Sequence, residues 1–427
     1  MVGRPGFQSA FQVDDAIGLS VSAAASAVSA FGVSRGRPTE DVVVDATRAA
    51  AAFTAHLKID GVAPPKWADL SGYYLTRDGR QVQLHANFPH HAAGITKLLG
   101  SGPERAAVEA AVATWDADAL ERALVADGMI AAKLRTLAEW DAHPHARATR
   151  DLPLLSFEQI GDAPPRTLPR LRRDQGAFTG VRVLDCARVL AGPVAGHTLA
   201  AHGADVLRVG AAQLPSVPVC VLTTGAGKRN AFVDLDTPAG ATTLAALLRD
   251  THVWIDAYRP GALAARGFSA ARAAALNPGV VVVELSAFDW VGPWAGRRGF
   301  DSIVQSTTGI VDAGQRAAGA SQPTPLPVQV LDFATGYLAA FAAARAIAHQ
   351  ARVGGSWRVR VSLLRTRNWL VGLGGPRPFT PQVAQPAPGS LYETDAAWGR
   401  LTLSLPPTGQ PMHAPQPLGS SEPAWLP

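Results

Sequence analysis

The chain has 427 residues, of which 47% are hydrophobic and 17% are charged, so it can bury a large apolar core in two or three domains. This composition excludes a broadly disordered chain and a disulfide-stabilised mini-protein. The formal net charge is +5, but the basic residues are scattered, which disfavours nucleic acid as a partner and leaves a small polyanionic ligand open.

The two cysteines, Cys186 and Cys220, are too few for a disulfide framework and have no partners at zinc-ligand spacing. We therefore expect a reducing, cytoplasmic setting and no bound metal. Residues 20–31 are mostly Ala and Ser and lack the Leu-rich core of a signal peptide. Uncharged apolar stretches such as 338–344 are shorter than the ~20 residues of a membrane span, so we expect no integral membrane segment.

Residues 1–150 predict a small α+β module. Asp78-Gly79 lies between two β-prone runs, which is typical of a hairpin turn. From 104 to 140, apolar residues recur at helical spacing, with a break at Asp116. Residues 151–179 carry four prolines and little periodicity, so we interpret them as an extended linker.

Residues 180–370 alternate between apolar runs and helical patterns. The runs that predict buried strands are 181–185, 204–209, 252–256 and 280–285. Pro193 suits the first position of a helix, and Gly203 suits its left-handed end. This rhythm predicts an α/β fold with a parallel sheet covered by helices on both faces. Residues 371–427 form a Pro-rich tail with room for one hairpin around Trp398, and we expect the tail to wrap a surface.

Three common motifs fail on inspection. The turn at 186–196 contains no G-x-G-x-x-G, which disfavours a nicotinamide cofactor. The Gly225–Arg229 stretch lacks the upstream glycine and the magnesium-binding hydroxyl of a P-loop. The pairs His90-His91 and His143-Pro144-His145 have no ligand set nearby, so we interpret them as ordinary surface or core residues.

A longer set of motifs appears in a consistent order and spacing. The motifs are Val183-Leu184-Asp185, Ala191-Gly192-Pro193, Gly203-Ala204-Asp205-Val206, Gly227-Lys228-Arg229, Arg259-Pro260-Gly261, Gly292-Pro293-Trp294, Gly299-Phe300-Asp301 and Asp332-Phe333-Ala334-Thr335-Gly336. Together they resemble the Rossmann-like half of the family III CoA-transferases, a family that includes formyl-CoA and carnitine CoA-transferases and α-methylacyl-CoA racemases. The resemblance covers roughly 181–370 and implies a Rossmann-like α/β fold.

The first 150 residues resemble the same family in a different place. The Asp78-Gly79-Arg80 hairpin, Trp115 and the stretch 135–140 look like elements that ordinary members carry after the Rossmann-like half. The resemblance therefore implies a rearranged or double-length member with a degenerate first copy. Ordinary members form dimers of two interlocked rings, so we expect either a homodimer or a monomer with an internal pseudo-dimer.

Asp332 is the candidate catalytic residue. By pattern alone it is an N-cap of the helix that follows, but the resemblance matches it to the family's catalytic aspartate. A carboxylate ionised at neutral pH beside a helix N-terminus can attack an acyl-CoA thioester and give an aspartyl-CoA thioester, from which a small carboxylic acid takes the CoA. We expect backbone N–H groups in a loop at Gly336 to bind the oxyanion.

Phe300 separates the two branches of the family. Racemases carry a histidine at this position, and a phenyl ring cannot carry a proton. We therefore expect a CoA-transferase of the EC 2.8.3 type. An acyl-CoA racemase and a non-catalytic acyl-CoA binder remain the alternatives, and the sequence carries no readable pattern for the acyl group or the acceptor acid.

The resemblance also implies contacts to coenzyme A, whose phosphates need cations or helix N-termini. It places Lys228, Arg229 and Arg298 near the phosphates, and it places Val189, Leu190 and Ala191 along the cofactor. Relatives carry a basic residue where this chain has Gly210-Ala211, so either the affinity for CoA is lower or another segment supplies the phosphate contact.

Overall fold

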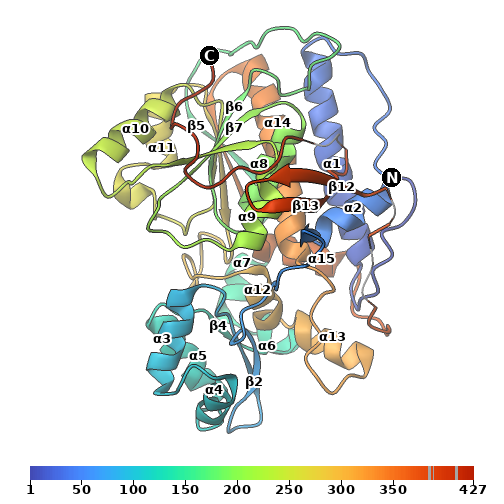
Figure 1. Cartoon of the computed structure of the whole chain (residues 1–427), viewed down its shortest axis with the longest axis vertical. Helices are drawn as coiled ribbons and strands as arrows, with labels where there is room; N and C mark the ends of the chain where they lie inside the picture. The colour runs from blue at the N-terminus through green and yellow to red at the C-terminus, as the bar shows by residue number, and fades with distance from the viewer. Residues whose placement is uncertain (383–385, 388, 409–411) are drawn as a thin grey trace.

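The computed structural model describes residues 1–382, 386–387, 389–408 and 412–427, and its centre is a seven-stranded sheet in the order β5-β11-β10-β9-β6-β7-β8 (Figure 1). The strands are β5 (Ser156–Gly161), β6 (Arg182–Cys186), β7 (Asp205–Gly210), β8 (Lys228–Phe232), β9 (Val253–Asp256), β10 (Val281–Ser286) and β11 (Ser356–Ser362). All neighbours pair in parallel except β5, which runs antiparallel to β11 at one edge.

The expected parallel α/β fold is confirmed. Val183 of β6 lies opposite Val206 of β7 in parallel register. Successive residues of each strand point to opposite faces, and both faces are buried because helices cover them. One face packs on α1 (Val13–Ser34), α8 (Ala191–Ala201) and α14 (Val330–Val353), and the other packs on α10 (Pro238–Arg249) and α11 (Ala270–Leu276).

The turn signals of this half are also confirmed in part. Gly203 adopts a φ of +95° just after α8, as a left-handed helix end requires. α8 itself begins at Ala191, so Pro193 lies inside its first turn and not at its first position. β8 was not predicted, because its alternating Lys228 and Asn230 are buried polar residues in place of an apolar run.

The N-terminal 150 residues divide into two parts, so the prediction of one module over this range is wrong. α1 lies along α14 within the main core, as the blue and orange helices of Figure 1 show. By length and composition these two helices are apolar enough to cross a membrane, yet 61% of the apolar window of α1 and 89% of that of α14 are buried inside the molecule. The apolar residues of both helices thus serve packing against the rest of the fold.

A separate small module follows (lower part of Figure 1). Its three-stranded sheet has the order β2-β3-β4 and packs against short helices around a core of its own. The elements are β2 (Gly72–Leu75), β3 (Gln81–Leu84), α3 (Pro89–Leu99), α4 (Arg105–Val112), α5 (Ala117–Ala126), β4 (Ala131–Lys133), α6 (Leu137–Asp141) and α7 (Pro144–Thr149). The Asp78-Gly79 turn is confirmed, with Gly79 at a φ of +71°.

Buried charges and aromatic rings hold the small module against the Rossmann-like half. Arg297 donates to the Glu121 carboxylate at 2.9 Å and to the Ala131 carbonyl at 3.0 Å, and its guanidinium lies 4.0 Å from the centre of the Trp294 ring. His145 bonds the Phe288 carbonyl through Nε2 and accepts the Trp294 N–H through Nδ1. The His143-Pro144-His145 stretch therefore has a structural role at this contact.

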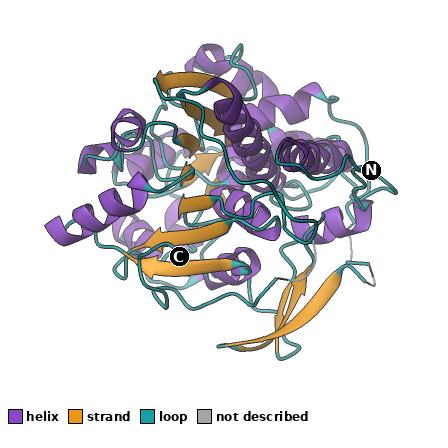
Figure 2. Ribbon diagram, turned by 90° about the horizontal axis from the view of Figure 1, so that it is seen from above, coloured by secondary structure: helices purple, strands orange, loops and turns teal. Residues whose placement is uncertain are grey.

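The predicted linker and tail both contain strands. β5 lies within 151–179 and pairs with β11, so this segment is partly an edge strand and not only an extended connector. The tail forms the expected hairpin, β12 (Leu391–Ala396) with β13 (Gly399–Ser404), and β13 also pairs with β1 (Leu57–Ile59) in a third sheet (Figure 2). The last residues run along the main sheet, where Trp425 donates to the Leu247 carbonyl at 3.0 Å.

Candidate functional site

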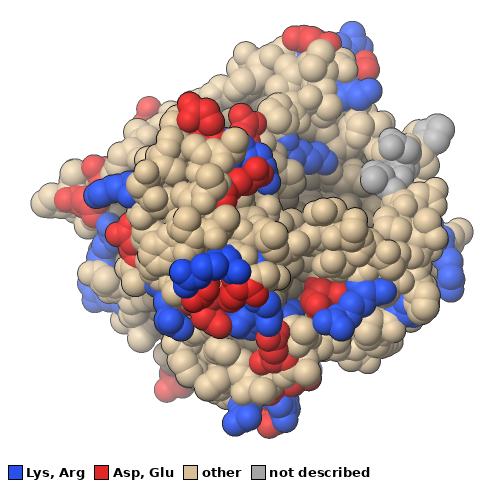
Figure 3. All heavy atoms as spheres, turned by 90° about the horizontal axis from the view of Figure 1, so that it is seen from below, with Lys and Arg blue, Asp and Glu red and all other residues tan. Residues whose placement is uncertain are grey.

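Three adjoining cavities lie at the carboxyl ends of β6, β7 and β9, next to the point where the chain crosses from one side of β6 to the other. We name them by their walls. The apolar cavity holds about 190 Å³, the middle cavity about 120 Å³ and the basic cavity about 500 Å³. Val189 and Phe300 line all three, and Asp332 lines the apolar and the middle cavities. Seen from below, the surface is hollowed, and Lys and Arg side chains lie inside the hollow (Figure 3).

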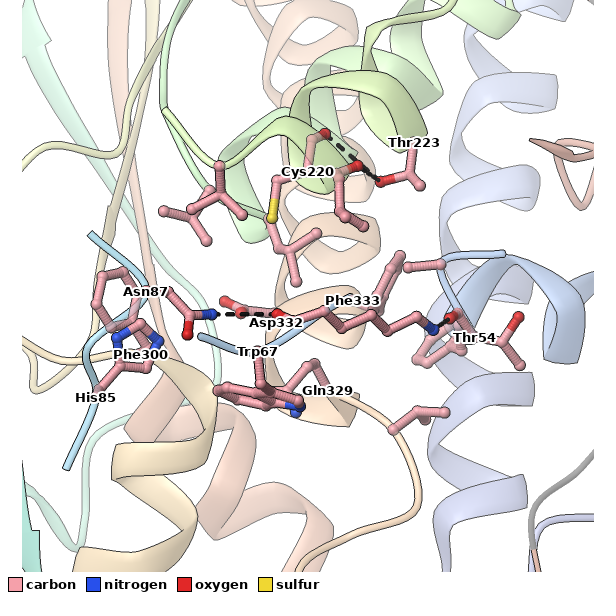
Figure 4. A pocket seen from close by; sticks show the side chains of 18 of the residues that line it. Thr54, Trp67, His85, Asn87, Cys220, Thr223, Phe300, Gln329, Asp332 and Phe333 are labelled. Carbon is pink, nitrogen blue, oxygen red and sulfur yellow. Dashed lines mark hydrogen bonds between the residues drawn. The ribbon is translucent and has the colours of Figure 1, made fainter. Parts of the chain in front are cut away.

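Asp332 lies in the first turn of α14 and its side chain points into the apolar cavity (Figure 4). Its carboxyl group accepts the backbone N–H of Ala191, the first residue of α8. Burial and the neighbouring Asp301 carboxyl raise the pKa of Asp332 well above its ordinary value. The pKa of Asp332 thus differs from the ordinary value that the sequence suggested, because only 6% of this residue is exposed and a second acid lies beside it.

Asp301, at the start of α12 (Asp301–Thr307), fixes the position of that helix turn. Its fully buried carboxylate accepts the backbone N–H of Asp332 at 2.9 Å and a bond from the Gln305 amide. It also accepts the backbone N–H of Leu331. Burial raises the pKa of Asp301 to about 6. Asp301 thus caps α14 from outside, a role that the Gly299-Phe300-Asp301 motif did not reveal because the two helices are separated in sequence.

Val189, Leu190 and Ala191 lie where the resemblance placed them relative to the candidate nucleophile. Val189 and Leu190 line the apolar cavity, and all three line the middle cavity together with Asp332. α8 starts at Ala191, so its first N–H groups face the same space. This turn is the wall that joins the two cavities.

Gly336 has a different role from the one expected. It lies in the second turn of α14, where backbone N–H groups bond within the helix, so it is not in a loop and offers no free donor. A Cβ atom here would stand 2.6 Å from the Ala191 carbonyl oxygen and 2.6 Å from the Val194 Cβ. The glycine therefore lets α14 approach α8 closely, which is what sets Asp332 beside Ala191.

Lys228 and Arg229 do not reach the cavities, so their expected contact with CoA phosphates is wrong. Lys228 is fully buried, and its ammonium bonds the Asp185 carboxylate and the Pro193 carbonyl, each at 2.7 Å. Arg229 points the other way, pairs with Asp205 at 2.9 Å and bonds the Ala424 carbonyl of the tail. Both cations are used to hold the fold together.

Arg298 lines the basic and middle cavities, and two further arginines, Arg188 and Arg259, line them with it. Arg188 follows β6 and Arg259 follows β9. Within the described residues no carboxylate pairs with any of the three. Burial lowers the pKa of Arg298, and the charges of Arg259 and Arg188 lower it further, which shows how closely the positive charges gather.

The basic cavity also explains the missing basic residue after β7. Gly210 and Ala211 line its wall, so the position is indeed at the cavity. Arg266, which lines the cavity from the segment after β9, is paired with Asp236 at 2.8 Å. The positive charge without a carboxylate partner therefore comes from Arg188, Arg259 and Arg298. The sequence alone did not assign Arg188 and Arg259 to the site, because the three arginines belong to three separate loops.

The small module supplies the opposite wall through residues 85–91. His85 lines the apolar cavity, and its ring stacks on Phe300 with a centroid separation of 4.2 Å. Its Nδ1 is buried without a hydrogen-bond partner among the described residues, and burial lowers the pKa of His85 to about 4. His90 is exposed and His91 is buried, as expected of surface and core residues, and both also line the basic cavity.

Comparison with known proteins gives a family for the Rossmann-like half. Residues 178–389 match the model of CoA-transferase family III. Curated relatives include an acetyl-coenzyme A transferase of Hypoxylon pulicicidum, 32% identical over 198 residues, which are 45% of this chain and 33% of the relative. A succinate–glutarate CoA-transferase of Agrobacterium fabrum is 32% identical over 205 residues, 44% of this chain and 51% of the relative.

A solved structure from Mycobacterium tuberculosis is 26% identical and has a TM-score of 0.40, with 46% of this chain and 58% of that chain covered. The chain spans between a third and about half of the length of the curated relatives named above. The matched residues include Asp332, the turn before α8 and the three unpaired arginines. The part of the chain that resembles CoA-transferase family III is thus residues 178–389.

Proposed function

We propose that the protein transfers coenzyme A from an acyl-CoA thioester to a free carboxylic acid, with Asp332 as the nucleophile. The observation that carries the proposal is the place of Asp332. Its carboxyl group lies on the wall shared by the apolar and middle cavities, and the unpaired arginines lie on the far side of the middle cavity. A thioester carbon at Asp332 thus has room for its acyl group on one side and for CoA on the other.

The first step forms a bond between an Asp332 oxygen and the thioester carbon, and it breaks the bond from that carbon to sulfur. This gives a mixed anhydride and the CoA thiolate. The thiolate then attacks the Asp332 carbonyl carbon, releases the acyl group as a carboxylate and leaves an aspartyl-CoA thioester. An acceptor carboxylate takes the CoA by the reverse of these steps. When the thiolate attacks, negative charge builds on the carbonyl oxygen of Asp332. The Ala191 N–H, which bonds the Asp332 carboxyl group, stabilises this charge.

The raised pKa of Asp332 affects this chemistry in two ways. A carboxylate with a higher pKa is a better nucleophile once it is ionised, because basicity and nucleophilicity rise together. It is also less fully ionised at neutral pH than an ordinary aspartate. The proposal therefore includes a rate that increases with pH through the pKa of Asp332.

The CoA phosphates fit the basic cavity. Arg188, Arg259 and Arg298 present guanidinium groups without carboxylate partners among the described residues, and such groups form strong charge-assisted bonds to phosphate. Tyr258, which lines the same cavity and the middle one, and the start of α8 extend the wall toward Asp332. We propose that pantetheine runs along this wall.

Trapping tests the covalent step. The full chain is incubated with an acyl-CoA and then with hydroxylamine, which cleaves an aspartyl thioester or anhydride and leaves a hydroxamate. Peptide mapping by mass spectrometry should find the hydroxamate on Asp332. A non-catalytic acyl-CoA binder gives no modified peptide, and a hydroxamate on another acid withdraws Asp332 from the role.

Acyl-CoA racemase activity is the second candidate, because the structure brings a histidine to the place where Phe300 had argued against one. His85 stacks on Phe300 and lines the cavity that holds Asp332. Its pKa of about 4 makes the imidazole a weak base, which is why this function ranks second. Exchange of the acyl α-proton in D₂O, followed by NMR, and its loss in His85→Phe would establish it.

The small module has the place of a degenerate first copy in this proposal. The family match begins at residue 178, and the module before it supplies His85, Asn87 and Phe88 to the apolar cavity. We propose that this chain is a rearranged or double-length member whose own N-terminal module completes the site. Light scattering decides between a homodimer and a monomer with an internal pseudo-dimer.

A further inference from the structure

We propose that the acyl group handled at Asp332 is apolar, either an alkanoyl chain of about six carbons or an aryl-alkanoyl group with one phenyl ring, and not a dicarboxylic acyl group. The inference rests on the proposed function and names its substrate class. It is carried by the walls, the charges and the size of the apolar cavity.

The geometry assigns the acyl group to the apolar cavity. CoA phosphates need the arginines of the basic cavity, and the reacting carbon must lie at Asp332. The middle cavity, which Asp332, Arg188, Arg259 and Arg298 all line, joins these two points. The acyl group extends beyond the reacting carbon, and the space on that side of Asp332 is the apolar cavity.

Aromatic rings form much of the wall of this cavity. They come from five places in the chain, namely Phe53, Trp67, Phe88, Phe300 and Phe333. Phe53 and Phe333 pack with ring centres 5.2 Å apart, and Figure 4 shows Phe333 beside Asp332. The phenyl rings bury apolar groups well and offer no hydrogen-bond donor to a second carboxylate, and the indole N–H of Trp67 is the one donor among these five rings.

The polar residues on the wall are mostly committed to the protein. The Asn87 carbonyl oxygen accepts the Ser71 hydroxyl at 2.7 Å, and its NH₂ donates to the Lys66 carbonyl at 3.2 Å. The Thr223 hydroxyl donates to the Val219 carbonyl at 2.8 Å. His85 and Gln329 keep side-chain atoms free, but a neutral imidazole and an amide do not balance a negative charge.

Charge gives the sharpest distinction. Lys66 is the one cation among the residues that line the cavity; its ammonium bonds the Thr54 carbonyl at 2.7 Å, and burial lowers the pKa of Lys66. The acids Asp332 and Asp301 lie on the buried side. A second carboxylate on the acyl group would lose its water next to like charge, which is costly without a paired cation.

Size limits the group from above. The cavity holds about 190 Å³. An apolar protein cavity of about 150 Å³ is enough to bind benzene, so this one accommodates a phenyl ring or a chain of about six carbons.

A panel of donors tests the inference on the full chain. Transfer of CoA to acetate is measured with hexanoyl-CoA, phenylacetyl-CoA, succinyl-CoA and glutaryl-CoA, and kcat/KM is compared. We expect the apolar donors to be better by at least about 10-fold, because unpaired polar groups in an apolar pocket discriminate strongly. Equal or better use of succinyl-CoA or glutaryl-CoA overturns the inference while it supports the proposed transfer reaction.

Binding gives a readout that does not need turnover. Calorimetry with Asp332→Asn compares the affinities of hexanoyl-CoA and succinyl-CoA with that of CoA. An affinity for hexanoyl-CoA about 10-fold or more above that for CoA, with no such gain for succinyl-CoA, supports the inference. This holds even if no donor transfers CoA, because that result would contradict only the proposed function. A succinyl-CoA affinity above that of hexanoyl-CoA overturns the inference.

Variants locate the acyl group. Val217→Phe and, as a second filling variant, Val328→Phe place a ring in the apolar cavity, so hexanoyl-CoA activity should fall by about 10-fold or more while acetyl-CoA activity changes little. Val353→Phe, at a position 52% exposed at the end of α14, is the matched control. Equal losses for both donors overturn the placement. Lys66→Ala should leave the ranking of the acyl-CoA donors unchanged. If the wild type prefers dicarboxylic donors and Lys66→Ala abolishes that preference, the inference is contradicted.

Discussion

The Rossmann-like half and the small module contribute to the site in opposite ways. The first provides the proposed nucleophile, Asp332, and the three arginines from strand ends and helix starts, where a parallel sheet regularly places ligand-binding residues. The second provides rings and histidines from the segment 85–91, held in place by a contact that includes Arg297. The position of Asp332 and the arginines thus follows from the regular geometry of a parallel sheet. The shape of the apolar cavity depends instead on how the small module is attached.

The largest effect should come from the reacting group itself. Asp332→Asn keeps the volume of the side chain and can still accept the Ala191 N–H, so the fold should survive. The amide cannot form an anhydride, and transfer activity should fall by at least ~1000-fold, or about 4 kcal/mol in barrier height. CoA affinity, measured by calorimetry, should change little. A folded variant that transfers CoA at a rate near that of the wild type would show that Asp332 only positions other groups.

The attachment of the small module can be broken separately. Arg297→Met removes the bond to the buried Glu121 carboxylate and leaves that carboxylate with Arg135 alone. We expect a loss of about 2–3 kcal/mol in the free energy of unfolding, measured in urea, because a buried charge loses a partner. Exposed Arg316→Met, whose partner Asp312 is on the same helix, should cost much less, because solvent screens an exposed ion pair. Equal losses would mean that the contact does not hold the module.

The arginines can be sorted by a matched pair of variants. Arg298→Ala should weaken CoA binding by about 10-fold and reduce its salt dependence, because a charge-assisted bond to phosphate is lost. Arg229→Ala removes a cation paired with Asp205 outside the cavities, so CoA affinity should stay the same. Calorimetry at two salt concentrations measures both. If Arg229→Ala weakens CoA binding as much as Arg298→Ala, the basic cavity is not where the phosphates bind.

The smallest effect concerns stability and pH. Burial and Asp301 raise the pKa of Asp332, so the folded chain binds more protons than the unfolded chain above the ordinary pKa. Stability from this group is full at low pH and is lost as the pH rises through its folded pKa. Asp332→Asn lacks this loss, so its advantage in unfolding free energy should grow as the pH rises from 4 to 8. An advantage that does not grow with pH contradicts the raised pKa.

The sequence predicted what local patterns determine and missed what distant contacts determine. Four apolar runs predicted four strands, and Asp332 was found through motif spacing. Lys228 was misplaced because its strand carries buried polar residues, and the Asp185 that pairs with it lies 43 residues away. Gly336 was taken for part of a loop because a close approach of two helices leaves no mark on a single sequence.

The third sheet pairs strands from the first and last parts of the chain, so it can form only late in synthesis. Leu57 of β1 pairs with Leu403 of β13, so the strand that precedes the Lys66–Trp67 segment has no partner until nearly the whole chain has been synthesised. Pairings across such sequence separations form late and slowly. The wall that carries Trp67 is thus completed last, and a nascent chain that already contains Asp332 still lacks a closed substrate pocket on the ribosome.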